Sequence, residues 1–483
     1  MAGRLEAITQ IVNRVDDLVW GVPLIISILA TGILLTVMLR FRHLLHLGSA
    51  FRYVFHQGDG HHGEVTAFGA LCTALSATIG TGNIVGVATA ITTGGPGALF
   101  WMEVAALFGM ATKYAEGLLA VKYREVAPDG RILGGPFYYI ERGLGKKWRP
   151  LAVLFAVFGI CAGLFGTGTI TQIHGIVSAV QRFFDPTFNP SDPTTGICIL
   201  GNTYSLSVMI AGAVVTACVG LVVIGGLKRI AKVSMVVVPF MAISYTAGCL
   251  LVMLGNLEKI PGAIGLIVKA AFDPAAVTGG AVGTLFIAMQ KGIARGIFSN
   301  EAGLGSEPIA AAAAKTNEPA RQGFVSMTGT FIDTTVICTM TGLTIVLSGA
   351  WDPSLKLEGV NVTIEAFSRG LAFLPGGTAV VPLFLMTALA FFAFTTILGW
   401  DYYSEKCLEY LVGMHRPHIV KCYRLLYVAV VAIGPYLTVS MVWGIADIFN
   451  GLMAFPNLVA LVLLSPVVAH TTRDFLARLK KSQ

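Results

Sequence analysis

Charged residues are scarce in this 483-residue chain. Asp, Glu, Lys and Arg together make up 12% of the residues, whereas hydrophobic residues make up 55% and the mean hydropathy is +0.75. A chain with so few charges cannot cover the surface of an ordinary water-soluble fold. The composition therefore predicts an all-α membrane protein that crosses the bilayer several times.

The motifs of metal sites and of common enzymes are also missing. The eight cysteines stand singly, with no CxxC pair and no Cys/His cluster at metal-ligand spacing. No HExxH sequence occurs, and no Ser or Cys stands beside a plausible base. The first apolar stretch, 18–39, runs into arginines rather than into a small-residue cleavage site, so we expect a span and not a signal peptide. These absences argue against an intramembrane enzyme.

Apolar segments are long and frequent. Hydropathy predicts eleven membrane-spanning helices, each long enough to cross about 30 Å of hydrocarbon. They lie at about 18–39, 65–93, 97–121, 150–181, 203–227, 230–255, 278–312, 322–349, 377–404, 425–441 and 443–469.

The basic residues predict the orientation of these spans. If the N-terminus lies outside, the cytoplasmic segments hold 23 of the 33 lysines and arginines, and the outside segments hold seven. We therefore expect a multi-pass protein of the inner (plasma) membrane, with its C-terminus in the cytoplasm. The net charge of +7 reflects this topology, and no nucleic-acid partner is needed to account for it.

The order of the segments repeats along the chain. Residues 65–255 and 278–469 each begin with a polar-centred span, continue with a second span and an amphipathic connection, and end with three spans. The connection at 123–149 contains ERGLG, and the one at 350–376 contains SRGLA. Because five spans is an odd number, the two units must face opposite ways, which is the inverted repeat of many secondary transporters.

The repeat divides a single membrane transport domain that comprises the whole chain, 1–483. We expect an extra N-terminal helix and loop at 18–56, the first five-helix repeat at 65–255, the inverted second repeat at 278–469 and a cytoplasmic tail at 470–483.

The first span of each unit is interrupted at its centre. Gly80-Thr81-Gly82-Asn83 breaks the uncharged stretch 65–93, and GIFSNEAGLGSEP (296–308) breaks the corresponding span of the second unit. Unwound backbone survives at membrane depth only where it lines a cavity or binds a ligand, because unpaired peptide groups cost several kcal/mol there. Such a break offers N–H groups to a carboxylate and carbonyl groups to a small cation.

The glycines of the first break also match two patterns that have no role in transport. Gly82 and Gly86 form a GxxxG pattern, which usually marks close helix packing, but two breaks at matching positions favour a binding site. The segment also resembles a dinucleotide-binding loop but lacks the required strand, turn and helix. A channel would need a ring of filter residues or a repeated pore helix, and a single polar crossing point provides neither.

Several polar residues lie in other spans. Gln172 and His174 follow a threonine-rich stretch in the third span of the first unit, and its counterpart carries Thr396 and Trp400 one helical turn apart. Charged residues in spans are costly, so we expect Lys291 and Arg295 to pair with Glu301, Glu307 and Asp333, and we expect a structural pair plus an extra carboxylate among Glu103, Lys113 and Glu116.

Four sequence blocks resemble those of a known family. TALSATIGTGNIVGVATAI, GGPGALFWMEVAALFGMATKYAE, GGPFYYIERGLG and GIFSNEAGLGSEPIAAAAAKT are similar to blocks of the alanine or glycine:cation symporters, the sodium:alanine symporters. The resemblance implies a leucine-transporter type fold, with ten core helices in two inverted fives, one extra N-terminal helix and two discontinuous helices. It also implies sodium-driven uptake of alanine or glycine, with D-alanine as a further candidate.

The resemblance also implies the site and its ligands. The sodium ion would be the coupling ion, and no organic cofactor or obligate protein partner is implied. A proton-coupled symporter of the same fold for another small amino acid is the alternative. The implied substrate-binding residues are Thr78, Gly80, Gly82, Asn83, Gln172, Phe298, Thr396 and Trp400. The implied sodium ligands are the carbonyl groups of Ser76 and Ile79 and the hydroxyl groups of Thr395 and Thr396.

Overall fold

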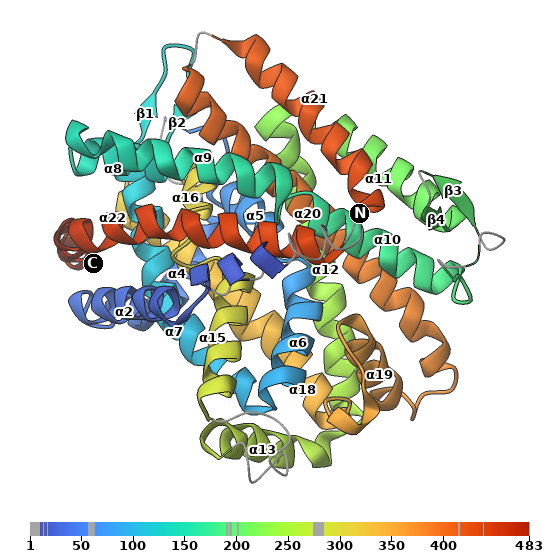
Figure 1. Cartoon of the computed structure of the whole chain (residues 1–483). Coiled ribbons are helices and arrows are strands. Elements are labelled where there is room, and N and C mark those ends of the chain that lie inside the picture. Colours follow the sequence, from blue (N-terminus) through green and yellow to red (C-terminus); the bar gives the residue numbers. More distant parts are fainter. Residues whose placement is uncertain are drawn as a thin grey trace.

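Helices form nearly all of the structure, a computed structural model that is drawn in Figure 1. It describes residues 10–12, 14–16, 18–56, 63–189, 192, 196–199, 202–273, 285–413, 416–437 and 439–482.

The first half of the chain contains eleven of the labelled helices. They are α2 (Val22–Met38), α3 (Arg42–Leu45), α4 (Leu47–Phe55), α5 (Ala67–Thr78), α6 (Val87–Gly94), α7 (Gly97–Lys122), α8 (Pro136–Gly143), α9 (Arg149–Phe165), α10 (Ile170–Phe184), α11 (Leu206–Val223) and α12 (Gly226–Leu254).

The second half of the chain is also helical. It contains α13 (Ile260–Phe272), α15 (Leu285–Asn300), α16 (Glu307–Ala311), α17 (Pro319–Thr330), α18 (Thr339–Ser348), α19 (Val360–Gly370), α20 (Gly377–Val412), α21 (Pro417–Ile433) and α22 (Val439–Ser482), together with a π-helical segment at Phe331–Cys338. The described residues also form two antiparallel ribbons, β1 (Glu125–Val126) with β2 (Ile132–Leu133) and β3 (Ile197–Ile199) with β4 (Asn202–Tyr204). Short 3-10 helices lie at Lys146–Trp148, Leu257–Lys259, Pro353–Leu355 and Gly434–Tyr436.

The prediction of a helical protein with many spans is confirmed at this level. Eight helical stretches of the described residues are long and apolar enough to cross a membrane, and α5 with α6 forms a ninth that bends by 54° at its break. The predicted first span corresponds to α2, which has 17 residues. The predicted span at 278–312 begins outside the described residues and contains α15, the second break and α16. The exact number of spans and the inverted repeat stay predictions.

Burial separates the helices into central and peripheral ones. In α7, 83% of the most apolar 18-residue window is buried, whereas in α11 the value is 22%. Glycines allow α7 to lie very close to its neighbours: a methyl group on Gly117 would come within 2.4 Å of Ser326 Oγ on α17. The exposed face of α11 carries Leu206, Ile210 and Val214, as expected for a surface that contacts lipid. The central position of α7 matters because it carries charged residues.

The span predicted at 150–181 lies within one apolar stretch, Lys146–Phe184, but the helix is interrupted at residues 166–169. Helix α9 ends at Phe165, and α10 begins at Ile170. The turn between them is held by the Thr169 hydroxyl, which donates to the Leu164 carbonyl oxygen at 2.7 Å, and by the Tyr427 hydroxyl, which donates to the Gly168 carbonyl oxygen at 2.9 Å. Threonine and tyrosine side chains thus replace helical hydrogen bonds, which hydropathy alone cannot reveal.

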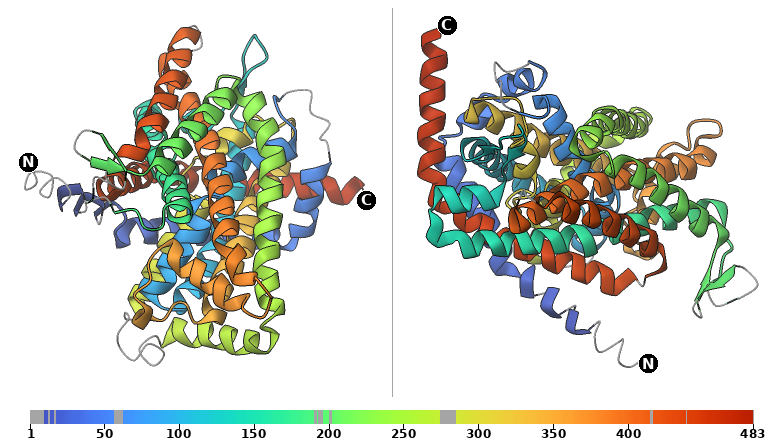
Figure 2. Two further views of the ribbon diagram at one scale, coloured as in Figure 1. Left: turned by 90° about the vertical axis from the view of Figure 1, so that its right-hand side faces the viewer. Right: turned by 90° about the horizontal axis from the view of Figure 1, so that it is seen from above.

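Helix α13 and the two small ribbons lie in connections where no sequence pattern indicated them. The predicted tail at 470–483 is helical as far as Ser482, as a continuation of α22. Figure 2 shows that α22 turns sharply before its C-terminal part, and the helix contains Pro456 and Pro466. In Figure 1, α8 and the β1–β2 ribbon lie at the upper end of the bundle, whereas α13 and α19 lie at the lower end.

Candidate functional site

The first break separates α5 from a π-helical turn, Gly82–Gly86, that leads into α6. Ile79 is extended, with φ −73° and ψ 98°. The backbone N–H of Gly80 donates to Asn83 Oδ1 at 2.9 Å, and Thr396 Oγ1 lies 3.3 Å from the Ile79 carbonyl oxygen. Side chains from the break itself and from α20 therefore form hydrogen bonds with peptide groups that would be paired within a continuous helix.

Gly80 lies where three elements meet. A methyl group at this position would come within 2.7 Å of Thr396 Oγ1 and 3.5 Å of Gln172 Oε1, so only glycine fits without a shift of its neighbours. Gln172 is 2% exposed, and its Oε1 has no hydrogen-bond partner among the described residues. A buried acceptor without a donor is costly, which suits it to a ligand that brings its own N–H groups.

Gly82 faces the helix that precedes the second break. A methyl group on Gly82 would lie 3.6 Å from the Phe298 ring, and the neighbouring Thr81 hydroxyl is buried without a partner among the described residues. A cavity of about 170 Å³ lies directly beside the break. It is lined by Thr81, Gly82, Val85, Gly86, Thr89, Arg295 and Phe298.

The remaining predicted substrate residues are buried nearby but already have partners. Trp400 is fully buried, and its indole N–H donates to Glu301 Oε1 at 3.1 Å. Asn83 is fully buried and uses Oδ1 for Gly80 and Nδ2 for Asp333 Oδ1, at 2.7 Å. Thr78 makes only long contacts, 3.4 and 3.5 Å, to carbonyl oxygens of its own helix. The indole of Trp400 therefore provides apolar surface and also connects α20 to the second break through its hydrogen bond to Glu301.

Two of the four predicted sodium ligands lie within contact distance of each other, namely the Ile79 carbonyl oxygen and the Thr396 hydroxyl. Thr395, on the same turn of α20, donates to the carbonyl oxygens of Phe391 or Phe392 at 3.1 and 3.0 Å. The Ser76 hydroxyl donates to its own helix, so only the carbonyl oxygen of Ser76 is a candidate ligand. Carbonyl and hydroxyl oxygens are ligands that hard cations prefer, so this donor set fits sodium.

The second break spans residues 301–306, between α15 and α16. Glu301, Gly303 and Gly305 all have positive φ values, 55°, 89° and 82°. The Ser306 hydroxyl donates to Glu301 Oε2, and the Asn457 amide of α22 donates to the Gly303 carbonyl oxygen at 2.9 Å. Neighbouring side chains thus hold a chain conformation that non-glycine residues rarely adopt.

Asp333 joins the two breaks. It lies in the π-helical segment Phe331–Cys338 and is fully buried. Its carboxylate accepts from Asn83 Nδ2 at 2.7 Å, from Ser299 Oγ at 2.8 Å and from Thr334 Oγ1 at 2.9 Å. The sequence indicated Asp333 only as a charged residue in a span, because hydropathy does not show which helices it contacts.

The charged residues in the spans do not form the ion pairs that the sequence predicted. Lys113 Nζ lies 2.8 Å from Glu307 Oε2 and is not paired with Glu103 or Glu116. Within the part of the chain that the structure describes, neither Lys291 nor Arg295 forms an ion pair with Glu301, Glu307 or Asp333. The cation that reaches the second break comes instead from α7, which packs against both α15 and α17.

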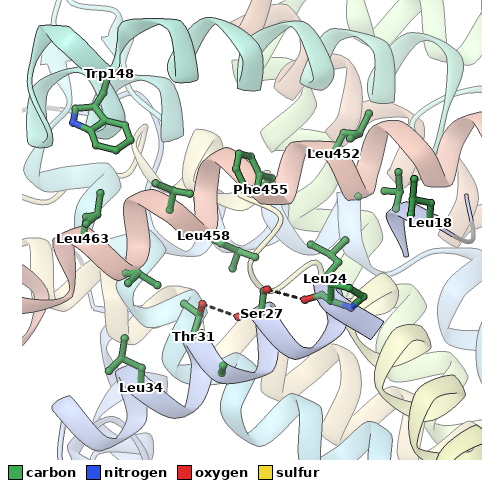
Figure 3. Close-up of a pocket in the computed structure, with 16 residues that line it drawn as sticks. Leu18, Leu24, Ser27, Thr31, Leu34, Trp148, Leu452, Phe455, Leu458 and Leu463 are labelled. Atoms are coloured by element: carbon green, nitrogen blue, oxygen red, sulfur yellow. Dashed lines mark hydrogen bonds between the residues drawn. The ribbon is translucent and has the colours of Figure 1, made fainter. Parts of the chain in front are cut away.

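A larger groove elsewhere in the molecule is a poor candidate for an amino acid. It runs between α2 and α22, and Figure 3 shows it lined by leucines, Phe455 and Trp148. The polar side chains labelled there, Ser27 and Thr31, donate to carbonyl oxygens of their own helix. A zwitterion needs partners for both charges, and the lining offers no charged group.

Comparison with known proteins identifies the family. The sequence pattern of the sodium:alanine symporter family matches residues 5–483. The chain belongs to this family. It is 52% identical over 474 residues to an uncharacterised transporter of Haemophilus influenzae, a match that covers 98% of this chain and 97% of the relative.

Two relatives have more specific names. The sodium/alanine symporter AgcS of Methanococcus maripaludis is 44% identical over 472 residues, covering 96% of this chain and 97% of AgcS. The probable sodium/glutamine symporter GlnT of Bacillus subtilis is 35% identical over 479 residues, covering 99% and 92%. The family consists of transporters, and membership in it supports amino-acid symport and a multi-pass membrane location.

Proposed function

We propose that this protein is a sodium-coupled symporter that imports alanine and glycine. The observation that carries the proposal is the meeting of Gly80, Gln172 and Thr396 at the first break, beside a small cavity. The unpartnered Gln172 Oε1 would accept from the substrate ammonium group. The unwound backbone of the break would receive the substrate carboxylate, which supports a site for zwitterions.

The proposed substrate site combines aromatic, polar and glycine residues. Phe298 and Trp400 supply aromatic surface, and Thr78, Gly82 and Asn83 complete the set of substrate residues that we propose. The cavity beside the break is lined by Gly82 and Phe298 of this set, together with Thr81, Val85, Gly86, Thr89 and Arg295. The names of AgcS and GlnT show that relatives are assigned different substrates, so competition experiments must decide the preference here.

The proposed sodium site lies at the junction of α5 and α20. The carbonyl oxygens of Ser76 and Ile79 and the hydroxyls of Thr395 and Thr396 would hold the ion. One sodium would contribute about 2.3 kcal/mol from a 100 mV potential and about 1.4 kcal/mol from a tenfold gradient. The sum, about 3.7 kcal/mol, permits accumulation of a neutral amino acid by several hundredfold.

We also propose alternating access, with the cavity open toward the outside in this conformation. Thr89 lines both this cavity and a larger hollow formed with residues 351–353 and 356–359, in the connection predicted to be extracellular. At the opposite end, Arg131 lies 2.6 Å from Glu409 Oε1, and this ion pair links the β1–β2 connection to α20. These contacts support a closed cytoplasmic side.

Uptake into proteoliposomes tests the function. Labelled alanine should accumulate when sodium is placed outside and should carry positive charge inward. Sodium and pH must be varied separately, because a proton-coupled symporter of the same fold would respond to pH alone. Uptake that ignores sodium would reject sodium coupling, and competition with D-alanine would measure stereoselectivity.

Cysteine labelling tests the inverted repeat and the orientation. A single cysteine near Arg142 on α8, in a cysteine-free background, should react with an impermeant reagent only from the cytoplasm. One near Arg369 on α19 should react only from outside. If both react from the same side, the inverted repeat is excluded.

A further inference from the structure

A buried cluster of one ammonium group and three carboxyl groups lies beside the second break. Lys113 Nζ lies 2.8 Å from Glu307 Oε2, and their side chains are 1% and 4% exposed. Glu116 and Glu301 are 0% and 1% exposed, and both act electrostatically on Lys113. The four residues come from α7, from the break and from α16, so the cluster joins a central helix to the segment that interrupts its neighbour.

The charges of this cluster do not balance. With all groups ionised, one lysine faces three glutamates, which leaves a net charge of −2 in a region without access to water. Removing even one unpaired charge from water costs several kcal/mol. Among the described residues, no group of three or more His, Cys, Asp or Glu side chains converges closely enough to hold a metal ion. A proton bound to one of the carboxyl groups would reduce the net charge to −1.

The hydrogen bonds indicate which carboxyl group carries the proton. Glu307 Oε2 forms an ion pair with Lys113 Nζ at 2.8 Å, and Glu301 accepts hydrogen bonds from the Trp400 indole at 3.1 Å and from the Ser306 hydroxyl. Glu116 accepts from the Asn457 amide on Oε1 at 2.6 Å, and the backbone of Gly303 also acts on its carboxyl group.

The remaining oxygen of Glu116 is unsupported. Glu116 Oε2 is buried and has no donor in hydrogen-bonding geometry among the described residues. The ionised form of this carboxyl group is therefore the least stabilised of the three.

A second polar group points to the same region. The Tyr403 hydroxyl of α20 is buried without a partner among the described residues, and the carboxyl groups of Glu301, Glu307 and Glu116 all act on it. Tyr403 also packs edge-on against Trp400, with ring centroids 5.8 Å apart. The charged groups around Glu116 are Lys113 on its own helix and Glu301 and Glu307 at the second break. The titratable groups from other helices are Tyr139 on α8 and Tyr403 on α20. Asp333 also acts on the cluster through its interaction with Lys113.

We propose that Glu116 holds a proton at neutral pH and that transport requires this proton. When this proton is lost to water, the carboxylic acid of Glu116 becomes a carboxylate, and the net charge of the cluster returns to −2. The carboxylate would then compete with Glu307 and Glu301 for Lys113 and would hold the second break in one conformation. This inference goes beyond the transported substrate and its coupling ion, because it depends only on movement of the break during the cycle.

The pH dependence of uptake tests the proposal. Labelled alanine uptake is measured at a fixed sodium gradient with equal pH on both sides of the liposome membrane. Wild-type uptake should fall by up to about tenfold per pH unit on the alkaline limb, where the proton is lost. Glu116→Gln imitates the protonated group, so its uptake should stay within about twofold over the same pH range.

Glu103→Gln is the matched control. Glu103 lies on the same helix and accepts from Thr339 at 2.8 Å, outside the cluster, so this variant should keep the wild-type pH profile. An alkaline limb that persists unchanged in Glu116→Gln overturns the proposal. If no variant and no wild-type protein transports alanine, the proposed function fails, and infrared spectroscopy still decides the protonation.

Infrared difference spectroscopy reads the proton directly. At neutral pH, the wild type should show the carbonyl stretching band of a protonated carboxyl group that is absent from Glu116→Gln. If Glu116→Gln does not fold, Glu116→Asp keeps a carboxyl group and should shift both the band and the pH profile. An identical set of carboxyl bands in the wild type and the variant overturns the proposal.

Discussion

The two breaks differ in length and in charge. The first covers Ile79 to Thr81, contains no ionisable side chain and leaves the Thr81 hydroxyl and Gln172 Oε1 without partners among the described residues. The second covers residues 301–306, carries Glu301 and is held by Ser306, Trp400 and Asn457.

This difference assigns different tasks to similar interruptions. A neutral break with unpartnered polar groups beside a cavity is suited to bind a ligand, because a ligand can supply the missing hydrogen bonds. In the second break, the Glu301 carboxylate already accepts hydrogen bonds from Trp400 and Ser306, so this break is suited to hold the adjacent helices in place. Asp333 connects the two, so a change in one break can reach the other through Asn83 and Ser299.

The largest expected effect comes from Asn83→Ala. This change leaves the Gly80 N–H and one Asp333 oxygen without their partner, which costs about 2–3 kcal/mol for a buried charged acceptor. Sodium-dependent uptake of alanine and glycine should fall together, by about 30-fold or more. Competition by unlabelled amino acids should keep its ranking.

Thr387→Ala, which removes an exposed hydroxyl bonded to its own helix, is the control and should behave as wild type. If Asn83→Ala changes the ranking and leaves alanine affinity intact, Asn83 selects side chains and does not organise the break.

A matched glycine pair tests whether the first break is a ligand site or a packing motif. Gly80→Ala places a methyl group 2.7 Å from Thr396 Oγ1, whereas Gly86→Ala places one in open space. Overpacking costs about 1–3 kcal/mol, so uptake by Gly80→Ala should fall by about tenfold. Gly86 lines the proposed cavity and its added methyl group would meet no neighbouring atom, so Gly86→Ala should keep its thermal stability in detergent, and a loss of stability would favour helix packing through GxxxG.

Arg124→Ala tests how firmly the second break is anchored. Arg124 donates to the carbonyl oxygens of Ala312, Ala314 and Thr316, at 2.6, 2.7 and 2.6 Å. These three residues lie in the segment that directly follows α16. Loss of these charge-assisted bonds should lower the free energy of unfolding by about 1–3 kcal/mol. Thermal unfolding in detergent measures the change, with the exposed Arg142 as the site of a control substitution.

The smallest effect on substrate ranking is expected from Trp400→Phe, although loss of the indole N–H removes a donor from the buried Glu301 carboxylate and should lower uptake of all substrates alike. The ring is retained in part, so transport should continue, but serine, valine and leucine should compete better against labelled alanine. Apolar walls discriminate by about 1–3 kcal/mol per methylene, and we expect the low end of this range. An unchanged ranking in both Trp400→Phe and Trp400→Ala would mean that Trp400 acts only through Glu301.

The positions of both breaks could be predicted because their signals are local. Glycines with polar neighbours interrupt the uncharged stretch 65–93 at residues 80–83 and the predicted span 278–312 at residues 303–305, and unwound backbone in lipid has few physical causes. The turn at residues 166–169 in the predicted span 150–181 carries the same Gly-Thr-Gly sequence as the first break, but hydropathy alone did not separate it from a continuous helix, because part of its hydrogen bonding comes from Tyr427 on a distant helix. The helical continuation of α22 beyond residue 469 was not predicted, because its last turns are too polar to resemble a span.

The sequence by itself determined the membrane class, the apolar spans, the two breaks and the family resemblance, because hydropathy, glycine content and sequence blocks are properties of short segments. Only the tertiary structure decided that Lys113 pairs with Glu307, that Asp333 joins both breaks and that Trp400 donates to Glu301. Each of these contacts joins residues far apart in the chain. Their distances depend on which helices pack together, and the charge of a residue does not specify its partner.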